Sequence, residues 1–223
     1  MNKTLLTIPQ LLLCAKDFCE QESKFPNREL FGVTDGKAVG TYIEHKFKDY
    51  LLSKYNLEAG SSASGIDLPS LEINTDIKVT SIKQPQSSCP FRNAQQKIFG
   101  LGYNLLVFVY DKHDDAPTKT ALLDFVSCSF IEKNRTADYQ TTTTLLQMIK
   151  NEANIEDVFA YLNDRNIPAD EITLMNMAEE ILKNPPEVGY LTISNALQWR
   201  LQYGRIVMMK DNIKGITKII DKC

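Results

Sequence analysis

The chain has 223 residues, of which 43% are hydrophobic and 24% are charged. These values suit one globular domain, or one domain with a subdomain, that buries its core without disulfide bonds. The net charge of −3 gives no support to nucleic-acid binding by the chain as a whole, so a DNA enzyme with this composition must gather its basic residues locally.

The numbers and spacing of the cysteines and histidines exclude several kinds of site. The five cysteines are odd in number and show no Cys-x-x-Cys spacing, which argues against a disulfide framework or a thiolate zinc site. The two histidines, His45 and His113, are too few for a histidine-rich metal site. No secretory pattern opens the chain, and no stretch approaches the ~18 apolar residues of a membrane span. We expect a cytoplasmic protein with reduced cysteines, no membrane partner and no organic cofactor.

Two helices are predicted in the first quarter of the chain. Apolar residues near helical spacing indicate a helical segment over residues 1–22, and Pro26, Gly32 and Gly36 then indicate a loop over residues 24–36. An amphipathic helix is predicted over residues 37–56, because its apolar residues recur three or four apart. After a small-residue loop at 59–64, two short strands are expected: Gly65–Leu68 and Asp76–Ile82.

The rest of the chain continues the alternation of helices and strands. We expect a helix over residues 90–101, a buried central strand at Asn104–Tyr110, a loop at Asp111–Pro117 and a strand at Lys119–Phe130. Residues 138–184 read as helical with a break at Pro168, and Thr192–Tyr203 reads as one more helix.

This order predicts an α/β (α+β) fold, in which helices flank a mixed central sheet and the C-terminal part is mostly helical. We expect residues 1–137 to form the core, and residues 138–223 to complete the same domain and contribute to DNA recognition.

The segment Ser64–Ser81 carries the candidate chemistry. Side chains alternate between the faces of a strand, so Asp76 and Lys78 share one face while Ile77 and Val79 share the other. If the two strands form an antiparallel hairpin, Asp67 lies across from the Asp76–Lys78 pair. Two carboxylates would then hold Mg²⁺, and Lys78 would hold a water molecule or offset charge on a phosphate.

The acid-x-Lys triplet is not specific by itself. It occurs four times, at Glu22, Asp35, Glu44 and Asp76, and the first three lie on predicted helix or loop. Only Asp76-Ile-Lys78 lies on a predicted strand with a second acid just upstream. The same pattern also fits an exposed hairpin with a surface Asp–Lys pair.

The helix, the two strand acids and the lysine together resemble the PD-(D/E)XK nuclease superfamily, and within it the type II restriction endonucleases. The resemblance covers roughly residues 36–110 and matches Glu44 to the helix acid, Asp67 to the first strand acid, and Asp76 and Lys78 to the acid-x-Lys motif. Ile66 stands where the motif name has proline. The resemblance implies a restriction-endonuclease-like fold and Mg²⁺ held by Glu44, Asp67 and Asp76. It also implies a homodimer that cleaves short palindromic double-stranded DNA and leaves 5′-phosphates.

Two groups of polar residues are candidates for DNA contacts. The run after the lysine strand supplies Lys83, Gln84, Gln86 and Ser87, and Arg92 and Lys97 could touch phosphates; an ordinary polar loop and surface salt bridges explain the same residues. Near the C-terminus Arg200, Gln202 and Arg205 suit guanine and adenine edges, whereas the neighbouring Trp199 also fits a core position.

Three other functions fit these residues. A structure-selective repair nuclease or junction resolvase would keep the same site and act on another DNA substrate. A non-catalytic DNA-binding module would keep the fold, although such modules usually lose one of the three residues Asp67, Asp76 and Lys78. An unrelated α/β protein would show no metal-dependent DNA binding.

Overall fold

The computed structural model describes residues 3–57, 65–89, 91–194 and 200–223. Within it the chain forms two compact units. The first, here called the sheet unit, contains Met1–Ser87, Tyr103–Glu132 and Val207–Cys223. The second, here called the helical unit, contains Ser88–Gly102 and Lys133–Ile206. That residues 138–223 complete one domain with the core and contribute to DNA recognition stays a prediction.

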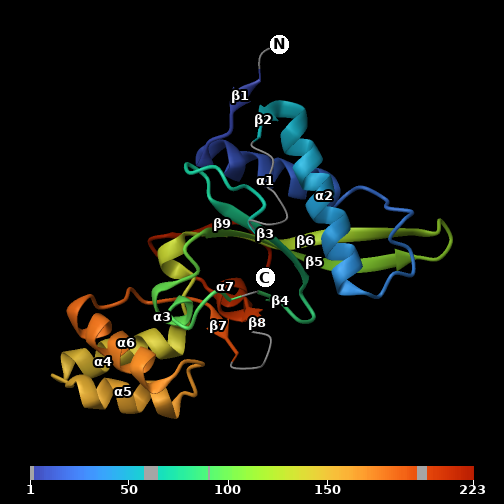
Figure 1. The fold of residues 1–223 in the computed structure, drawn as a ribbon. Coiled ribbons are helices and arrows are strands. Elements are labelled where there is room, and N and C mark those ends of the chain that lie inside the picture. The colour runs from blue at the N-terminus through green and yellow to red at the C-terminus, as the bar shows by residue number, and fades with distance from the viewer. Residues whose placement is uncertain (1–2, 58–64, 90, 195–199) are drawn as a thin grey trace. The chain divides into compact units, whose positions relative to one another are not determined.

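The sheet unit is built on a mixed four-stranded sheet with the order β3-β5-β6-β9 (Figure 1). Strand β3 (Thr75–Ser81) is an edge strand and pairs in parallel with β5 (Asn104–Asp115). Strand β6 (Thr120–Ile131) pairs antiparallel with β5 and with β9 (Ile216–Asp221). The expected mixed sheet is therefore confirmed.

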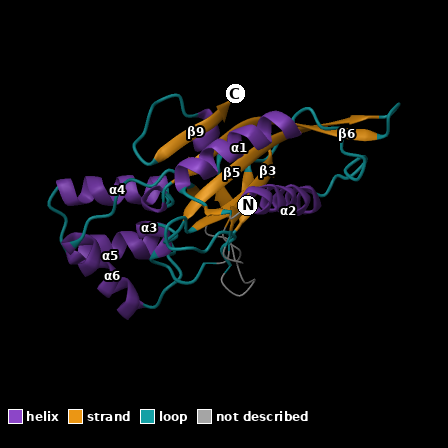
Figure 2. Ribbon diagram, turned by 90° about the horizontal axis from the view of Figure 1, so that it is seen from above, coloured by secondary structure: helices purple, strands orange, loops and turns teal. Residues whose placement is uncertain are grey.

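Helices α1 (Ile8–Glu22) and α2 (Gly36–Lys54) cover one face of this sheet (Figures 1 and 2). The apolar stripe of α2 lies in the core with the inward residues of β3, β5 and β6, as its helical spacing predicts. Four aromatic rings pack together in tilted or edge-to-face contacts, with centroids between 5.0 and 6.1 Å apart: Phe18, Phe47, Phe108 and Phe125. A short parallel pair, β1 (Thr4–Leu5) and β2 (Tyr55–Asn56), lies beside the helices.

The helical unit packs α4 (Tyr139–Lys150), α5 (Ile155–Asp164) and α6 (Glu171–Lys183) around a second apolar core. Each helix begins at a residue whose side chain accepts a hydrogen bond from the backbone N–H three positions later: Asp138, Asn154 and Asp170. The prediction of helices over residues 138–184 is confirmed. The unit also contains α3 (Gln96–Phe99), a 3₁₀ turn (Lys133–Arg135), β7 (Thr192–Ile193) and β8 (Arg200–Gln202).

Several predicted elements are wrong. Gly65–Leu68 is not a strand; one antiparallel bridge joins Leu68 to Thr75. The helix expected over 90–101 shrinks to α3, with Pro90 outside the described residues. The loop expected at Asp111–Pro117 is wrong because β5 continues to Asp115: its polar side chains face outward while its backbone pairs with β6.

The helix expected at Thr192–Tyr203 is also wrong. Buried Leu201 lies between exposed Arg200 and Gln202, which is the two-residue alternation of a strand, and β8 pairs antiparallel with β7. Trp199 lies outside the described residues. Beyond Arg205 the chain forms α7 (Gly204–Met208) and β9, and β4 (Gln86–Ser88) completes the set of strands. Among the described residues, no helix combines the length and the apolar character that crossing a membrane requires.

Candidate active site

Strand β3 presents the predicted acid and lysine together. Asp76 and Lys78 project from the face opposite Ile77, and Asp76 Oδ2 lies 2.7 Å from Lys78 Nζ. The Asp76 side chain is only 5% exposed and that of Lys78 is 20% exposed. Burying a carboxylate this deeply costs free energy of folding unless charged or hydrogen-bonding partners surround it. The pair is therefore part of an organised polar site and not an exposed surface ion pair.

Asp67 lies along the open edge of β3. The Leu68–Thr75 bridge brings it beside the strand, where its Oδ2 accepts a 2.8 Å hydrogen bond from the Ile77 N–H. Because β3 is an edge strand, this N–H has no strand partner on that side, and the carboxylate satisfies it. Asp67 is also hydrogen-bonded to Asp76. The proximity expected from a hairpin is thus achieved by one bridge and a side-chain contact.

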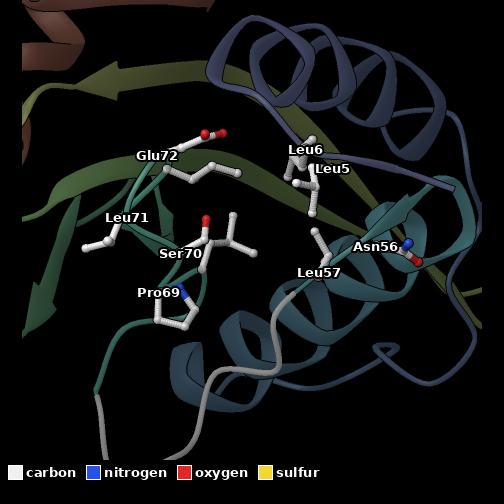
Figure 3. Close-up of a pocket in the computed structure, with 10 residues that line it drawn as sticks. Leu5, Leu6, Asn56, Leu57, Pro69, Ser70, Leu71 and Glu72 are labelled. Carbon is white, nitrogen blue, oxygen red and sulfur yellow. The ribbon is translucent and has the colours of Figure 1, made fainter.

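The turn between the two aspartates is short and internally bonded. The Asn74 N–H donates to the Ser70 carbonyl at 2.7 Å, and Asn74 adopts a φ of 37° that asparagine tolerates better than most residues. The apolar side of the turn lines a pocket of about 310 Å³ opposite β1 and β2. Figure 3 shows Leu6 and Leu57 across this pocket from Pro69. The two aspartates are not among the residues that line it, so they lie beside the pocket and not inside it.

Helix α2 contributes two charged side chains to the same edge. Lys48 Nζ lies 2.8 Å from Glu44 Oε1 and 2.5 Å from Asp67 Oδ1. Gly40, Glu44 and Lys48 are four residues apart and share one face of the helix. A Cβ on Gly40 would lie 3.2 Å from the Val79 carbonyl oxygen, so the absent side chain lets this face approach β3 closely.

The structure therefore joins all four predicted site residues in a chain of contacts that runs from Glu44 through Lys48 and Asp67 to Asp76 and Lys78. Sequence reasoning missed Lys48 as a member of the site. The available signal was its position one helical turn after Glu44, which allows an ion pair on the same face of a helix.

The two aspartates differ in their titration. Burial, against the opposing effect of Lys78 and together with the hydrogen bond to Asp67, raises the pKa of Asp76 to about 7. Burial also tends to raise the pKa of Asp67, but hydrogen bonds from Asp76, Lys48 and Ile77 N–H hold it below its usual value. Two carboxylates this close cannot both carry full charge at low cost, so the pair shares one proton near neutral pH.

Glu44 is joined to Asp67 through Lys48, which contacts both carboxylates. Within the described residues, no three Asp, Glu, His or Cys side chains gather closely enough to hold a metal ion together. The Asp67–Asp76 pair alone fits Mg²⁺, which proteins often bind through one or two carboxylates while water and substrate phosphates complete the shell. The Lys48 ammonium occupies the position of a cation between Glu44 and Asp67.

The candidate DNA-contacting residues of the sheet unit follow β3 directly. The Gln86 N–H donates to Thr80 Oγ1 at 3.1 Å, and the Thr80 hydroxyl group donates in turn to the Gln86 carbonyl at 3.0 Å. Thr80 shares the strand face of Asp76 and Lys78, so it fixes the following loop next to them. Along that loop the exposed or half-buried candidates are Lys83, Gln84, Gln86 and Ser87.

The candidates of the helical unit differ in exposure. Arg92, Arg200, Gln202 and Arg205 are exposed. The Arg205 guanidinium carbon lies 3.5 Å from the centroid of the Tyr139 ring. Lys97 is fully buried, and this burial lowers its pKa although Asp138 lies near enough to oppose the shift. In this structure Lys97 exposes no surface to a phosphate, and we leave it out of the proposed interface.

Helices that flank a mixed sheet, with Asp76 and Lys78 on its edge strand and Asp67 beside it, are consistent with the restriction-endonuclease-like class. The model of the family described as "Type II restriction enzyme NspV" matches residues 5–218. The type II restriction enzyme NspV of Nostoc sp. (strain ATCC 29411 / PCC 7524) is 54% identical over 216 residues, which are 97% of each chain. No solved structure matches the chain significantly. The chain belongs to the NspV family of type II restriction enzymes, which confirms the expected class.

The close approach of α2 to β3 can be tested at Gly40. Gly40→Val should push α2 away from the Val79 carbonyl and withdraw Glu44 from the edge, reducing DNA cleavage by about 10- to 100-fold, as expected for a shift near 1 Å. Gly36→Val is the matched control, because a Cβ there meets nothing within 4 Å. Initial cleavage rates and melting temperatures of both variants would be measured. Equal rates for the two variants would contradict the role given to Gly40.

Proposed function

We propose that the enzyme is a member of the PD-(D/E)XK superfamily that hydrolyses phosphodiester bonds of double-stranded DNA with Mg²⁺ and leaves 5′-phosphates. The observation that supports this best is the contact of Asp67, Asp76 and Lys78 at the edge of β3. Strand alternation and chain order predicted the same residues for this chemistry. Membership of the NspV family of type II restriction enzymes supports site-specific cleavage of DNA as the reaction.

Asp67 and Asp76 would hold the metal ion, with Glu44 supporting it from α2. A bound Mg²⁺ would polarise the phosphodiester and lower the pKa of a water molecule. On becoming a ligand Asp76 would release its proton to solvent, so that both carboxylates would be in the form that Mg²⁺ requires. The repulsion between the two acids is then relieved.

Lys78 would act directly on the reacting atoms. Its ammonium is held at Asp76, so it reaches the same place as the metal ligands and carries hydrogens that can be donated. Donation to the attacking water orients this water, and donation to a non-bridging phosphate oxygen stabilises the charge that grows there. Asp76 thus has two tasks, since it binds the metal ion and positions Lys78.

Substrate binding is assigned to polar side chains near the site and on the helical unit. Lys83, Gln84, Gln86 and Ser87 follow the catalytic strand and would contact DNA near the scissile phosphate. Arg92 would contact a backbone phosphate, and the exposed Arg200, Gln202 and Arg205 would contact base edges. A palindromic target has two-fold symmetry, so we propose that a homodimer binds it.

The first experiment is incubation of the purified enzyme with unmethylated phage DNA in Mg²⁺ and, separately, in EDTA. Discrete bands in Mg²⁺ alone, with ends that a ligase joins without prior phosphorylation, are expected for the proposed reaction. A metal-dependent smear would show that cleavage is not sequence-specific. Bands that persist in EDTA would show that cleavage does not need a metal ion. Binding without cleavage in Mg²⁺ would indicate a non-catalytic DNA-binding protein.

A further inference from the structure

Lys48 joins two of the three carboxylates assigned to the metal site. Its ammonium contacts Glu44 Oε1 at 2.8 Å and Asp67 Oδ1 at 2.5 Å. Glu44 and Lys48 lie on the same helix, whereas Asp67 comes from the segment that precedes β3. One positive charge therefore holds α2 against the edge of the sheet at the carboxylates themselves.

The oxygens of Asp67 are already in use. Oδ1 accepts from Lys48, Oδ2 accepts from the Ile77 N–H, and the carboxylate also bonds with Asp76. The Lys48 side chain is 27% exposed, which gives its ammonium a route to solvent. A divalent cation that takes Asp67 Oδ1 as a ligand would repel the ammonium at short range, since both carry positive charge.

We propose that Lys48 is a positioning residue that occupies the cation position of the metal-free site and is displaced when a divalent metal ion binds. This inference rests on the proposed assignment of Asp67 and Asp76 as metal ligands. In the metal-free enzyme Lys48 keeps Glu44 and Asp67 together and offsets their repulsion. Part of the energy of metal binding is then spent on moving Lys48, so the metal-ion affinity of the enzyme is lower than its carboxylates alone would give.

Lys46 offers a matched control on the same helix. Its Nζ lies 2.7 Å from Glu22 Oε2, and its side chain is 30% exposed, close to the 27% of Lys48. Lys46 contacts Glu22 and Asn27, and its ammonium also lies over the rings of Phe25 and Tyr42; none of these residues is part of the proposed metal site. Lys46→Met and Lys48→Met therefore change the net charge equally, and only Lys48→Met alters the charge at the metal ligands.

The test is titration of Ca²⁺ into the DNA-free enzyme, followed by calorimetry and by the melting temperature. Lys48→Met should bind Ca²⁺ about tenfold more tightly than the unchanged enzyme, which corresponds to roughly 1.4 kcal/mol. Ca²⁺ should also raise its melting temperature further. Lys48→Arg keeps the charge and should bind like the unchanged enzyme, as should Lys46→Met. A purely structural role for Lys48 predicts the opposite sign, because disordered ligands bind more weakly.

Asp76→Asn distinguishes the proposed metal site from the proposed displacement of Lys48. Loss of Ca²⁺ binding in Asp76→Asn together with equal or weaker binding in Lys48→Met would overturn the displacement of Lys48 and leave the metal site in place. Unchanged Ca²⁺ binding in Asp76→Asn would overturn the metal site itself, and the proposal for Lys48 with it. Tighter binding in Lys48→Met but not in Lys46→Met, with loss in Asp76→Asn, supports both.

Discussion

Replacing Lys78 with alanine is expected to reduce DNA cleavage by at least about 1,000-fold while leaving the fold intact. Loss of one preorganised donor at a developing charge typically costs 10²- to 10³-fold, and loss of water positioning adds to it. The ammonium is held 2.7 Å from Asp76 and the Lys78 side chain is 20% exposed, so Lys78 can reach both the proposed metal ligands and a substrate. Its removal leaves Asp76 free to take the proton that burial already favours, which limits the effect on stability.

The chain contains a suitable control for this loss. Lys112 pairs with Asp114 at 2.5 Å, which is also an ion pair between positions two apart on a strand of the same sheet. Lys112→Ala should cleave at nearly the normal rate. Binding of target DNA in Ca²⁺ would be measured for both variants, and we expect similar affinities. Near-normal cleavage by Lys78→Ala, or an equal loss in Lys112→Ala, would show that Lys78 is not catalytic.

The candidate site was predictable because its main signal is local. The two-residue alternation of β3 places Asp76 and Lys78 on one face whatever the rest of the fold does. Chain order then separated this acid-x-Lys triplet from three others on helix or loop. The position of Asp67 was predicted through a strand that does not exist, because one bridge at Leu68 places it as well as a full hairpin would.

The role of Lys48 could not be predicted in the same way. A lysine one turn after a glutamate on a solvated helix face is an ordinary surface pair worth a few tenths of a kcal/mol. Its contact with Asp67 exists only because Gly40 lets α2 approach β3 and because Asp67 occupies the strand edge. Both the approach of α2 to β3 and the position of Asp67 are features of the tertiary structure, and neither leaves a periodic signal in the sequence.

The misassigned elements have a common cause. Arg200 to Gln202 is too short a run for its period to be distinguished from that of a helix. Asp111–Asp115 is polar enough to resemble a loop, yet its backbone groups are paired along the β5–β6 ladder. In both segments pairing with a distant strand decided the structure. The helix α2 and the first part of the strand β5 were predicted correctly, because the apolar stripe of α2 and the apolar run of β5 are signals in their own residues.

Asp76→Asn is expected to abolish cleavage. At about pH 8 it is nevertheless expected to raise the melting temperature of the metal-free protein by several degrees. The pKa of Asp76 is raised from 3.8 to about 7 in the folded protein, so folding takes up a proton between these values. The stability that the protonated group supplies is complete below the unfolded pKa and is lost as the pH rises through about 7. Asparagine carries no charge at any of these pH values, so it avoids that loss.

Asp67→Asn should change stability in the opposite direction. The pKa of Asp67 is lowered in the folded protein despite its burial, so its charged form stabilises the fold above the unfolded pKa. At about pH 8 we therefore expect a lower melting temperature for Asp67→Asn and a higher one for Asp76→Asn. At about pH 4 Asp76→Asn should approach the unchanged protein, whereas Asp67→Asn should do so only as the pH falls through the folded pKa of Asp67, which lies below 3.8. Thermal unfolding across this range without metal would measure both curves. Equal signs for the two variants would show that the aspartates do not share the proton as inferred.

Added Mg²⁺ should reverse the ranking of Asp76→Asn and the unchanged enzyme. The unchanged protein gains stability as Mg²⁺ is added, and above the Kd this gain grows with the logarithm of the Mg²⁺ concentration, since a ligand that binds only the folded state stabilises it. Asp76→Asn has lost a proposed ligand and should gain little. The buried position beside Asp67 that makes a charged Asp76 unfavourable for folding is thus the same property that fits it to bind Mg²⁺. A crossing of the two melting temperatures with increasing Mg²⁺ would connect stability and function at one carboxylate.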